Sequence, residues 1–241
     1  MTERNIWVIS DTHFNHGNII KYCDRPFDNA TQMNDYMVEM WNSVVKPTDK
    51  VYHLGDVYMG SGFSREYTAH LLKYRLNGHK RLILGNHDNG KDQILQGVFE
   101  KIDVWRMFPE FGLLLTHVPV HEQSLFRGAT GNEKEPKKLL NVHGHIHTLA
   151  SPSKDHRCVC VEQIDYKPIN IEELRKWWFC MSDSELRAAR AKELKKKRNL
   201  AAQTLLNPKN KFKERVDPRK PIYKREKLSV RNLPMEEDTY E

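Results

Sequence analysis

The sequence predicts an α/β fold with mixed sheets, and three observations lead to this class. Short apolar runs of strand length alternate with helical patterns over the first 100 residues. Later apolar runs follow one another with short links, as the strands of a mixed sheet do. The first 181 residues form a body long enough to bury most of its apolar surface in one core. We therefore expect two packed sheets with helices on the outside.

The first half of this body is expected to alternate strands with helices. Apolar runs that end in polar segments predict strands at residues 5–10, 50–54 and 80–84. Apolar residues at helical spacing predict a helix at residues 31–45, which a proline-containing segment then ends. The same reasoning predicts helices at residues 64–76 and 92–99.

The second half of the body is expected to contain mainly strands. Apolar runs predict strands at residues 104–108, 113–116 and 139–142, and an alternating pattern predicts another at residues 157–163. The polar, glycine-containing segment 125–138 is expected to be a loop. A helix at residues 171–179 is expected to close the body.

The positive charge of the protein lies entirely in its last 60 residues. The net charge is +7, from 39 basic and 32 acidic residues, and residues 182–241 carry 17 of the basic and 10 of the acidic ones. That leaves 22 of each in residues 1–181. A capping-box pattern at Ser182 and Glu185 predicts a basic helix at residues 182–206. Prolines and sparse apolar residues predict an extended or disordered charged tail at residues 207–241.

Composition also excludes several protein classes. No run of 18 apolar residues exists, so the sequence predicts no membrane span. The first ten residues lack the apolar stretch of a signal peptide, and we expect a cytoplasmic protein. The four cysteines show no framework spacing and are expected to stay reduced.

Polar residues of metal-binding type recur directly after the predicted strands. They form five segments in chain order: Asp11-x-His13, Gly55-Asp56, Gly85-Asn86-His87-Asp88, His117 and Gly144-His145-x-His147. A single Asp or His at a strand end is usually a cap or a hydrogen-bonded side chain. Five such segments in order indicate a site, because the loops at the carboxyl ends of strands gather at one edge of an α/β fold.

The residue types indicate which metals such a site would bind. Histidine nitrogens and carboxylate oxygens without thiolates suit Mn, Fe, Zn or Ni in a hydrolytic centre and do not suit a structural zinc site. Seven candidate ligands are too many for one ion, and one shared carboxylate makes them sufficient for two. Two ions about 3.5–4 Å apart can clamp a phosphoryl group and turn a bridging water into a hydroxide nucleophile near neutral pH. We expect two divalent ions, with Mn the first expectation.

At these five segments the sequence resembles the calcineurin-like metallophosphoesterase superfamily, whose pattern is D-x-H, G-D, G-N-H-D/E, H and G-H-x-H. The resemblance covers residues 6–178. It is closest to a small, uncapped subgroup of bacteria and their phages, through DTHFNHGNII at 11–20, RPF at 25–27, VYHLGD at 51–56 and DYKPI at 165–169. The resemblance implies a four-layer α/β/β/α sandwich, with residues 1–181 as the catalytic domain.

The resemblance also implies a role for each residue. One metal would be held by Asp11, His13 and His147. The second would be held by Asn86, His117 and His145. Asp56 would bridge the two ions. His87 would face the substrate and protonate the leaving oxygen as a general acid, and Asp88 would orient His87 by accepting its other N–H.

Two further residues are weaker candidates for binding substrate. His16 could contact the substrate phosphate, as its place in the subgroup's pattern suggests, or it could bond a nearby loop. The fork-shaped donors of Arg25 could bind phosphate, or they could form a structural ion pair.

The sequence therefore predicts a dinuclear metal-dependent phosphoesterase. Few segments are long enough to cap the site, and an open site favours phosphodiesters such as nucleotides or related small diesters. A nuclease that holds DNA or RNA with the basic tail is one alternative, and a phosphomonoesterase is another. A binding module without catalytic activity is the alternative of a different class. Every ligand of the family pattern and His87 are present, which favours an enzyme. The oligomeric state is left open.

Overall fold

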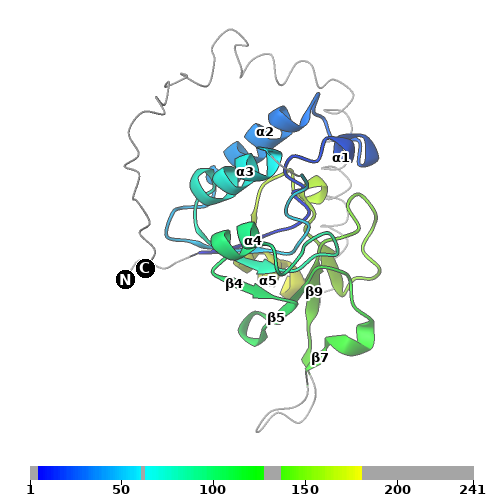
Figure 1. Cartoon of the computed structure of the whole chain (residues 1–241). Helices are drawn as coiled ribbons and strands as arrows, with labels where there is room; N and C mark the ends of the chain where they lie inside the picture. Colours follow the sequence, from blue (N-terminus) through cyan, green and yellow to red (C-terminus); the bar gives the residue numbers. More distant parts are fainter. Residues whose placement is uncertain (1–4, 61–62, 128–136, 181–241) are drawn as a thin grey trace, which may run out of the picture. The chain divides into compact units, whose positions relative to one another are not determined.

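The structure is a computed structural model, and it describes residues 5–60, 63–127 and 137–180. The chain folds there into two mixed sheets with helices, so the predicted α/β class is confirmed (Figure 1). The basic helix expected at 182–206 and the charged tail expected at 207–241 lie outside the described residues. In the described part of the chain, no helix has the length and apolarity needed to cross a membrane.

The first sheet contains four parallel strands and one antiparallel edge strand. The parallel strands are β1 (Ile6–Ile9), β2 (Lys50–His53), β3 (His79–Ile83) and β4 (Lys101–Asp103). The short β11 (Ile169–Asn170) pairs antiparallel with β1. Since β1, β2 and β3 are neighbours and parallel, the loops that follow them leave the same edge of the sheet.

The second sheet has the strand order β10-β9-β6-β5. Its members are β5 (Trp105–Phe108), β6 (Leu113–Thr116), β9 (Leu140–His143) and β10 (His156–Cys158). Strand β5 is antiparallel to β6, whereas β6, β9 and β10 are parallel. Both β6 and β9 therefore end at one edge of this sheet. A separate pair, β7 (Phe126–Arg127) and β8 (Lys137–Lys138), lies in the segment expected to be a loop.

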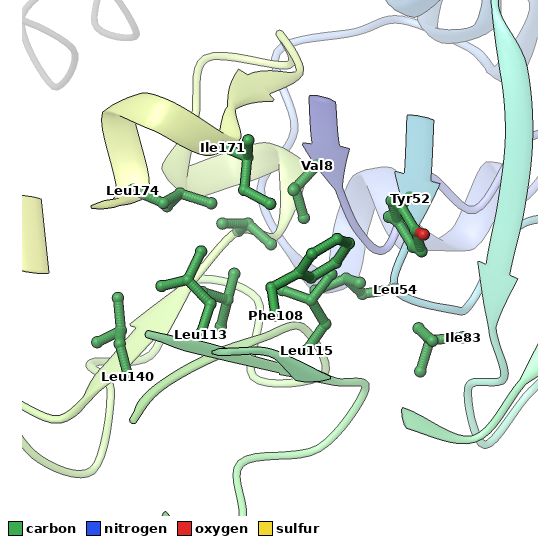
Figure 2. Close-up of a cluster of buried hydrophobic side chains, with 12 residues drawn as sticks. Val8, Tyr52, Leu54, Ile83, Phe108, Leu113, Leu115, Leu140, Ile171 and Leu174 are labelled. Carbon is green, nitrogen blue, oxygen red and sulfur yellow. The ribbon is translucent and has the colours of Figure 1, made fainter. Parts of the chain in front are cut away.

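The main core lies between the two sheets (Figure 2). Tyr52 of β2 and Phe108 of β5 meet edge to face with ring centroids 5.2 Å apart, so this contact joins the sheets. Figure 2 also shows Ile171 and Leu174 of helix α5 (Ile171–Cys180) in the same cluster. Each buried aliphatic side chain there contributes about 1.5–3 kcal/mol. This shared core holds the strand ends of both sheets in one arrangement.

The expected helices are present, with different ends. The helix α2 (Ala30–Asn42) is capped by Asn29, whose side chain accepts a hydrogen bond from the Gln32 N–H. It buries Met33, Met37 and Trp41. Residues 64–76 form α3 (Phe63–His70) followed by a π-helical segment, Leu71–Arg75. The helix α4 (Gln93–Val98) begins after the capping residue Asp92.

Other features also differ from the sequence prediction, including strand β4, which was not predicted. A short helix, α1 (Gly17–Tyr22), has no side-chain cap and was not predicted. Strand β11 is also additional. The strand expected at 157–163 was wrong beyond residue 158, because the chain there crosses to bridge Ser10 of the first sheet and then turns into a 3₁₀ helix, Val161–Gln163.

Candidate metal centre

The predicted ligand residues lie together because each follows the carboxyl end of a strand, and these strand ends are neighbours. Asp11 and His13 follow β1, Asp56 follows β2, and Asn86 follows β3. The second sheet adds His117 after β6, and His145 and His147 after β9. The hydrogen bond from the Gly144 N–H to the His117 carbonyl, 2.8 Å, ties the last two loops to each other.

Five of these seven residues have a left-handed backbone. Their φ angles are 57° for Asp11, 48° for His13, 56° for Asp56, 70° for His145 and 47° for His147. This conformation is rare for residues other than glycine and costs about 1–3 kcal/mol per residue. The fold maintains it at one cluster, as functional sites commonly do.

The first ligand group consists of Asp11, His13 and His147. One ligand atom from each lies within 4.8 Å of the others. The Oδ1 atom of Asp11 is 3.6 Å from Nε2 of His147 and 3.9 Å from Nε2 of His13. These atoms surround a space of the size that a divalent ion occupies.

The second ligand group consists of Asn86, His117 and His145. The amide oxygen of Asn86 lies 2.8 Å from Nε2 of His117 and 2.9 Å from Nδ1 of His145. The ligand atoms of His117, His145 and Asp56 are all within 4.8 Å of one another. Asn86 and His145 are exposed, so this group faces solvent.

Asp56 lies between the two groups. Its Oδ2 atom is 3.7 Å from Nε2 of His13 and 3.5 Å from Nε2 of His117. One carboxylate therefore faces a histidine of each group, which is the geometry that a shared ligand requires.

Buried atoms of the first group support a cation site. Within the described part of the chain, Asp11 Oδ1 and both ring nitrogens of His13 are buried and have no hydrogen-bond partner. Burial, reinforced by the nearby Arg25 charge, lowers the pKa of His13 to about 2, so the imidazole is neutral. Burial disfavours the charged form of Asp11 and so raises the pKa of its carboxyl, and a cation bound there would favour the carboxylate. A neutral imidazole and an unpartnered carboxylate oxygen are the forms that bind divalent metals, so these residues fit such an ion.

Two glycines allow the carboxylates to approach the backbone closely. A Cβ atom at Gly85 would lie 2.2 Å from Oδ1 of Asp56, and one at Gly144 would lie 2.2 Å from Oδ2 of Asp11. No side chain fits at either position without displacing a predicted ligand.

Contacts behind the ligands determine which ring nitrogen faces the site. His117 places Nδ1 at 2.7 Å from the carbonyl of Leu54, which leaves Nε2 toward Asp56. His147 places Nδ1 at 3.0 Å from Oε1 of Glu162. Burial disfavours the charged form of His147, but hydrogen bonds with Cys23 and Glu162 outweigh it and raise its pKa to about 10. A divalent ion at Nε2 would replace that proton, while the Nδ1–H remains on Glu162.

Glu162 was not predicted as a site residue. It falls within the expected strand 157–163, where the alternating pattern gave no sign that it leaves the sheet. The position of this carboxylate directly after the apolar residues 158–161 was the available signal.

His87 lies beside both groups and is exposed. Its ring centroid is 5.8 Å from that of His13, and its backbone N–H donates to Oδ1 of Asp56 at 2.9 Å. An exposed imidazole next to the ligand groups can reach a substrate that binds there.

Asp88 does not accept a hydrogen bond from the His87 ring, so this predicted contact was wrong. Its carboxylate accepts from the backbone N–H groups of Asp56 at 2.8 Å, Gly85 at 2.9 Å and Val57 at 3.0 Å. The tight turns after β2 and β3 leave these N–H groups without strand partners, and the Asp88 carboxylate satisfies them. Burial raises the pKa of Asp88, although the three backbone hydrogen bonds oppose that shift. Asp88 therefore holds the two turns together.

His16 and Arg25 differ in their access to the site. The ring of His16 is half-buried, and its centroid lies 5.5 Å from that of His13. His16 is therefore close enough to contact a substrate bound at the first ligand group. Arg25 is buried, and its Nη2 pairs with Oε1 of Glu162 at 2.7 Å. This geometry is the structural ion pair, and it leaves the guanidinium directed away from solvent.

A pocket opens beside His87 and has a volume of about 140 Å³. Its walls come from the loop after β2, from α3 and from the loop before α4, and they include Tyr58, Arg65, Asn89 and Asp92. The carboxylate of Asp92 accepts from the Tyr58 hydroxyl and from Arg65, the latter at 2.7 Å. The pocket is smaller than the roughly 300–1,000 Å³ typical of drug-sized ligands, so it suits a compact group.

Comparisons with known proteins identify a family and several similar proteins. A family model described as calcineurin-like phosphoesterase matches residues 4–200. An uncharacterised protein of the archaeon Methanocaldococcus jannaschii is 35% identical over 184 residues, covering 73% of this chain and 92% of that protein. The gene 66 protein of Mycobacterium phage D29 is 40% identical over 178 residues, covering 63% of this chain and 86% of that protein. A crystal structure of a protein of unknown function from Aquifex aeolicus superposes with a TM-score of 0.56 at 28% identity, covering 72% of this chain and 99% of that one.

Proposed function

The chain belongs to the calcineurin-like phosphoesterase family of metal-dependent phosphoester hydrolases, and from this premise we propose that it hydrolyses phosphodiesters, of nucleotide type or related small diesters. The observation that carries the proposal is the pair of adjacent ligand groups on either side of Asp56, with His87 exposed next to them. Two divalent ions, which we propose to be manganese, would supply charge neutralisation and an activated water at this centre.

The protein's own side chains would perform the remaining chemistry. His87 would stabilise charge on the phosphoryl oxygens and donate a proton to the leaving oxygen. Its backbone N–H bond to Asp56 places the His87 loop against the carboxylate between the two ligand groups. Asp88 would act as a positioning residue, since its carboxylate holds the turns that carry Asp56 and His87.

Exposure of the centre supports a diester substrate. Asn86, His87 and His145 are all exposed, so a phosphate with an alcohol on each side has room to approach. The pocket beside His87 would receive the leaving group, because the proton goes to the leaving oxygen on that side. Its small volume favours a compact leaving group.

The test is hydrolysis of a panel of diesters, cyclic nucleotides and monoesters after chelation and readdition of Mn²⁺. We expect Mn²⁺ to restore diester hydrolysis, Asp56→Ala to abolish it, and Asp103→Ala to leave it unchanged. Asp103 is the matched control, because it ends the neighbouring strand β4 and pairs with Lys101 at 3.2 Å. His87→Ala should keep its metal and lose about 10²–10⁴-fold in rate. Full activity of the metal-free protein, or preference for monoesters, would refute the proposal.

A nuclease is the second candidate, and the charge of residues 182–241 is the observation that favours it. Phosphate contacts by those basic residues would make nucleic-acid binding fall steeply with salt. Cleavage of DNA or RNA that weakens with salt, and that is lost on replacing Lys195, Lys196, Lys197 and Arg198 by alanine, would favour the nuclease. Equal binding with and without those charges would count against it.

A further inference from the structure

Three charged and polar residues behind the centre form one connected network. Glu162 accepts hydrogen bonds at Oε1 from Nε and Nη2 of Arg25, at 2.9 and 2.7 Å, and from Nδ1 of His147 at 3.0 Å. The side chain of Arg25 is 0% exposed, and that of Glu162 is 6% exposed. Glu162 and Arg25 are 137 positions apart in the chain, so the fold alone brings them together.

Arg25 also holds the loop that carries the other two members of the first ligand group. Its Nη2 donates to the carbonyl of Asp11 at 2.7 Å, and its Nη1 donates to the carbonyl of Thr12 at 2.9 Å. These carbonyls belong to the segment with left-handed backbone at Asp11 and His13. The guanidinium therefore connects the strained loop after β1 with the carboxylate that contacts His147.

The side chains of the second ligand group have hydrogen-bond partners outside this network, and the link to it runs through the His145 backbone, whose N–H donates to Oδ2 of Asp11 at 2.9 Å. His117 is fixed by the carbonyl of Leu54 at 2.7 Å, and the Asp88 carboxylate holds the turn before Asn86. In the described part of the chain, neither Arg25 nor Glu162 has a hydrogen bond to a member of that group.

We propose that Glu162 and Arg25 are positioning residues for the first ligand group alone. Glu162 accepts the Nδ1–H of His147 and so directs Nε2 toward Asp11, while Arg25 fixes the carbonyls of Asp11 and Thr12 relative to Glu162. A carboxylate that orients a metal-binding imidazole in this way typically affects metal affinity about 10- to 100-fold. The two ions would then depend unequally on this pair. The inference rests on the proposed two-ion centre.

Metal affinity without turnover provides the test. Calorimetric titration of the full chain with Mn²⁺ should give two tight sites, and Glu162→Gln should weaken one of them about 10- to 100-fold while the other stays unchanged. In Glu162→Gln, the electron spin resonance signal of coupled Mn²⁺ pairs should be replaced by that of isolated Mn²⁺ ions. Arg25→Lys keeps the charge but loses the fork geometry, so it should weaken the same site. Asp35→Asn removes a carboxylate that pairs with Arg75 at 2.9 Å away from the centre, and it should change neither site.

A second variant separates metal binding from stability. Glu162→Gln leaves the Arg25 charge buried without its partner, which destabilises the fold. The double variant Arg25→Met with Glu162→Gln removes that charge, so part of the lost stability should return while the weakened site stays weak.

The outcomes distinguish the inference from the proposed function. If both sites weaken equally in Glu162→Gln, or if neither changes, the inference is wrong while the two-ion centre stands. If the unaltered protein binds no Mn²⁺ at two sites, the centre itself is wrong, and the inference fails with it.

Discussion

Replacing Asp88 tests whether this carboxylate acts on the backbone or on the His87 ring. The structure gives it three backbone donors at 2.8, 2.9 and 3.0 Å, from Asp56, Gly85 and Val57. An unsatisfied buried donor costs about 1–3 kcal/mol, and because Asp88 is half-buried, water can replace part of what is lost. Asp88→Ala should therefore reduce the free energy of unfolding by about 3 kcal/mol, near one kcal/mol for each donor.

The asparagine variant gives a sharper expectation. The amide nitrogen of asparagine replaces one of the two carboxylate oxygens. Replacement at Oδ1 loses one hydrogen bond, whereas replacement at Oδ2 would lose two, so the nitrogen should take the Oδ1 position. We expect a loss of about 1–3 kcal/mol for Asp88→Asn. Small shifts of Asp56 and His87 should follow, and a misplacement of about 1 Å can reduce the rate about 10²-fold.

The assay combines urea unfolding of the chelated protein with the pH dependence of Mn²⁺-supported diester hydrolysis. The control is Gln96→Ala, because Gln96 is exposed and its side chain donates one bond to the Gly90 carbonyl at 3.0 Å. It should change stability by less than about 0.5 kcal/mol. Unchanged stability in Asp88→Asn together with a shifted pH profile would refute the backbone role and restore the predicted contact with the His87 ring.

Two other predictions follow from the geometry. Gly144→Ala should remove metal from the first ligand group and abolish activity, because its Cβ would lie 2.0 Å from Oγ of Ser10 and 2.2 Å from Oδ2 of Asp11. Analysis of the metal content checks this expectation. The control is Gly97→Ala, whose Cβ would have no atom within 4 Å, and it should leave the metal content unchanged. Burial lowers the pKa of Lys80 from 10.5 to about 8, so between these pH values the unfolded chain binds a proton that the folded chain has released, and stability rises with pH. Lys80→Met should remove this rise of about 3 kcal/mol, measured by urea unfolding from pH 7 to pH 10, and an unaltered slope would show that Lys80 is not the group responsible.

The sequence predicted most strands because their apolar runs are contiguous and end at polar motifs. The helix at 31–45 was recognisable for a similar reason, since Met33, Met37 and Trp41 repeat on one face and are all buried. Prediction failed at residues 159–163, where local alternation resembles a strand but the chain leaves the sheet for a bridge to Ser10. Such a crossing depends on a partner 150 positions earlier, and no local pattern records it.

The site shows the same division between local and distant information. Asp11, His13 and the other predicted ligands stand in short motifs, so their types and order identified them. The partner of Asp88 was predicted wrongly because the direction of a side chain after a tight turn depends on backbone angles that sequence does not display. Glu162 was missed because its role depends on His147, which reaches it from another loop.

From the sequence alone came the α/β class, the strand-end motifs and the kind of metal chemistry they suit. These depend on local physical properties: hydrophobic periodicity, glycine at tight turns and the donor atoms of each side chain. Tertiary structure alone decided which atoms face one another, with Asp56 between two ligand groups, Asp88 on backbone N–H groups and Arg25 on Glu162. The reason is that hydrogen bonds require a separation near 3 Å and a defined direction, and only the packing of two sheets over a shared core brings such distant residues to that separation.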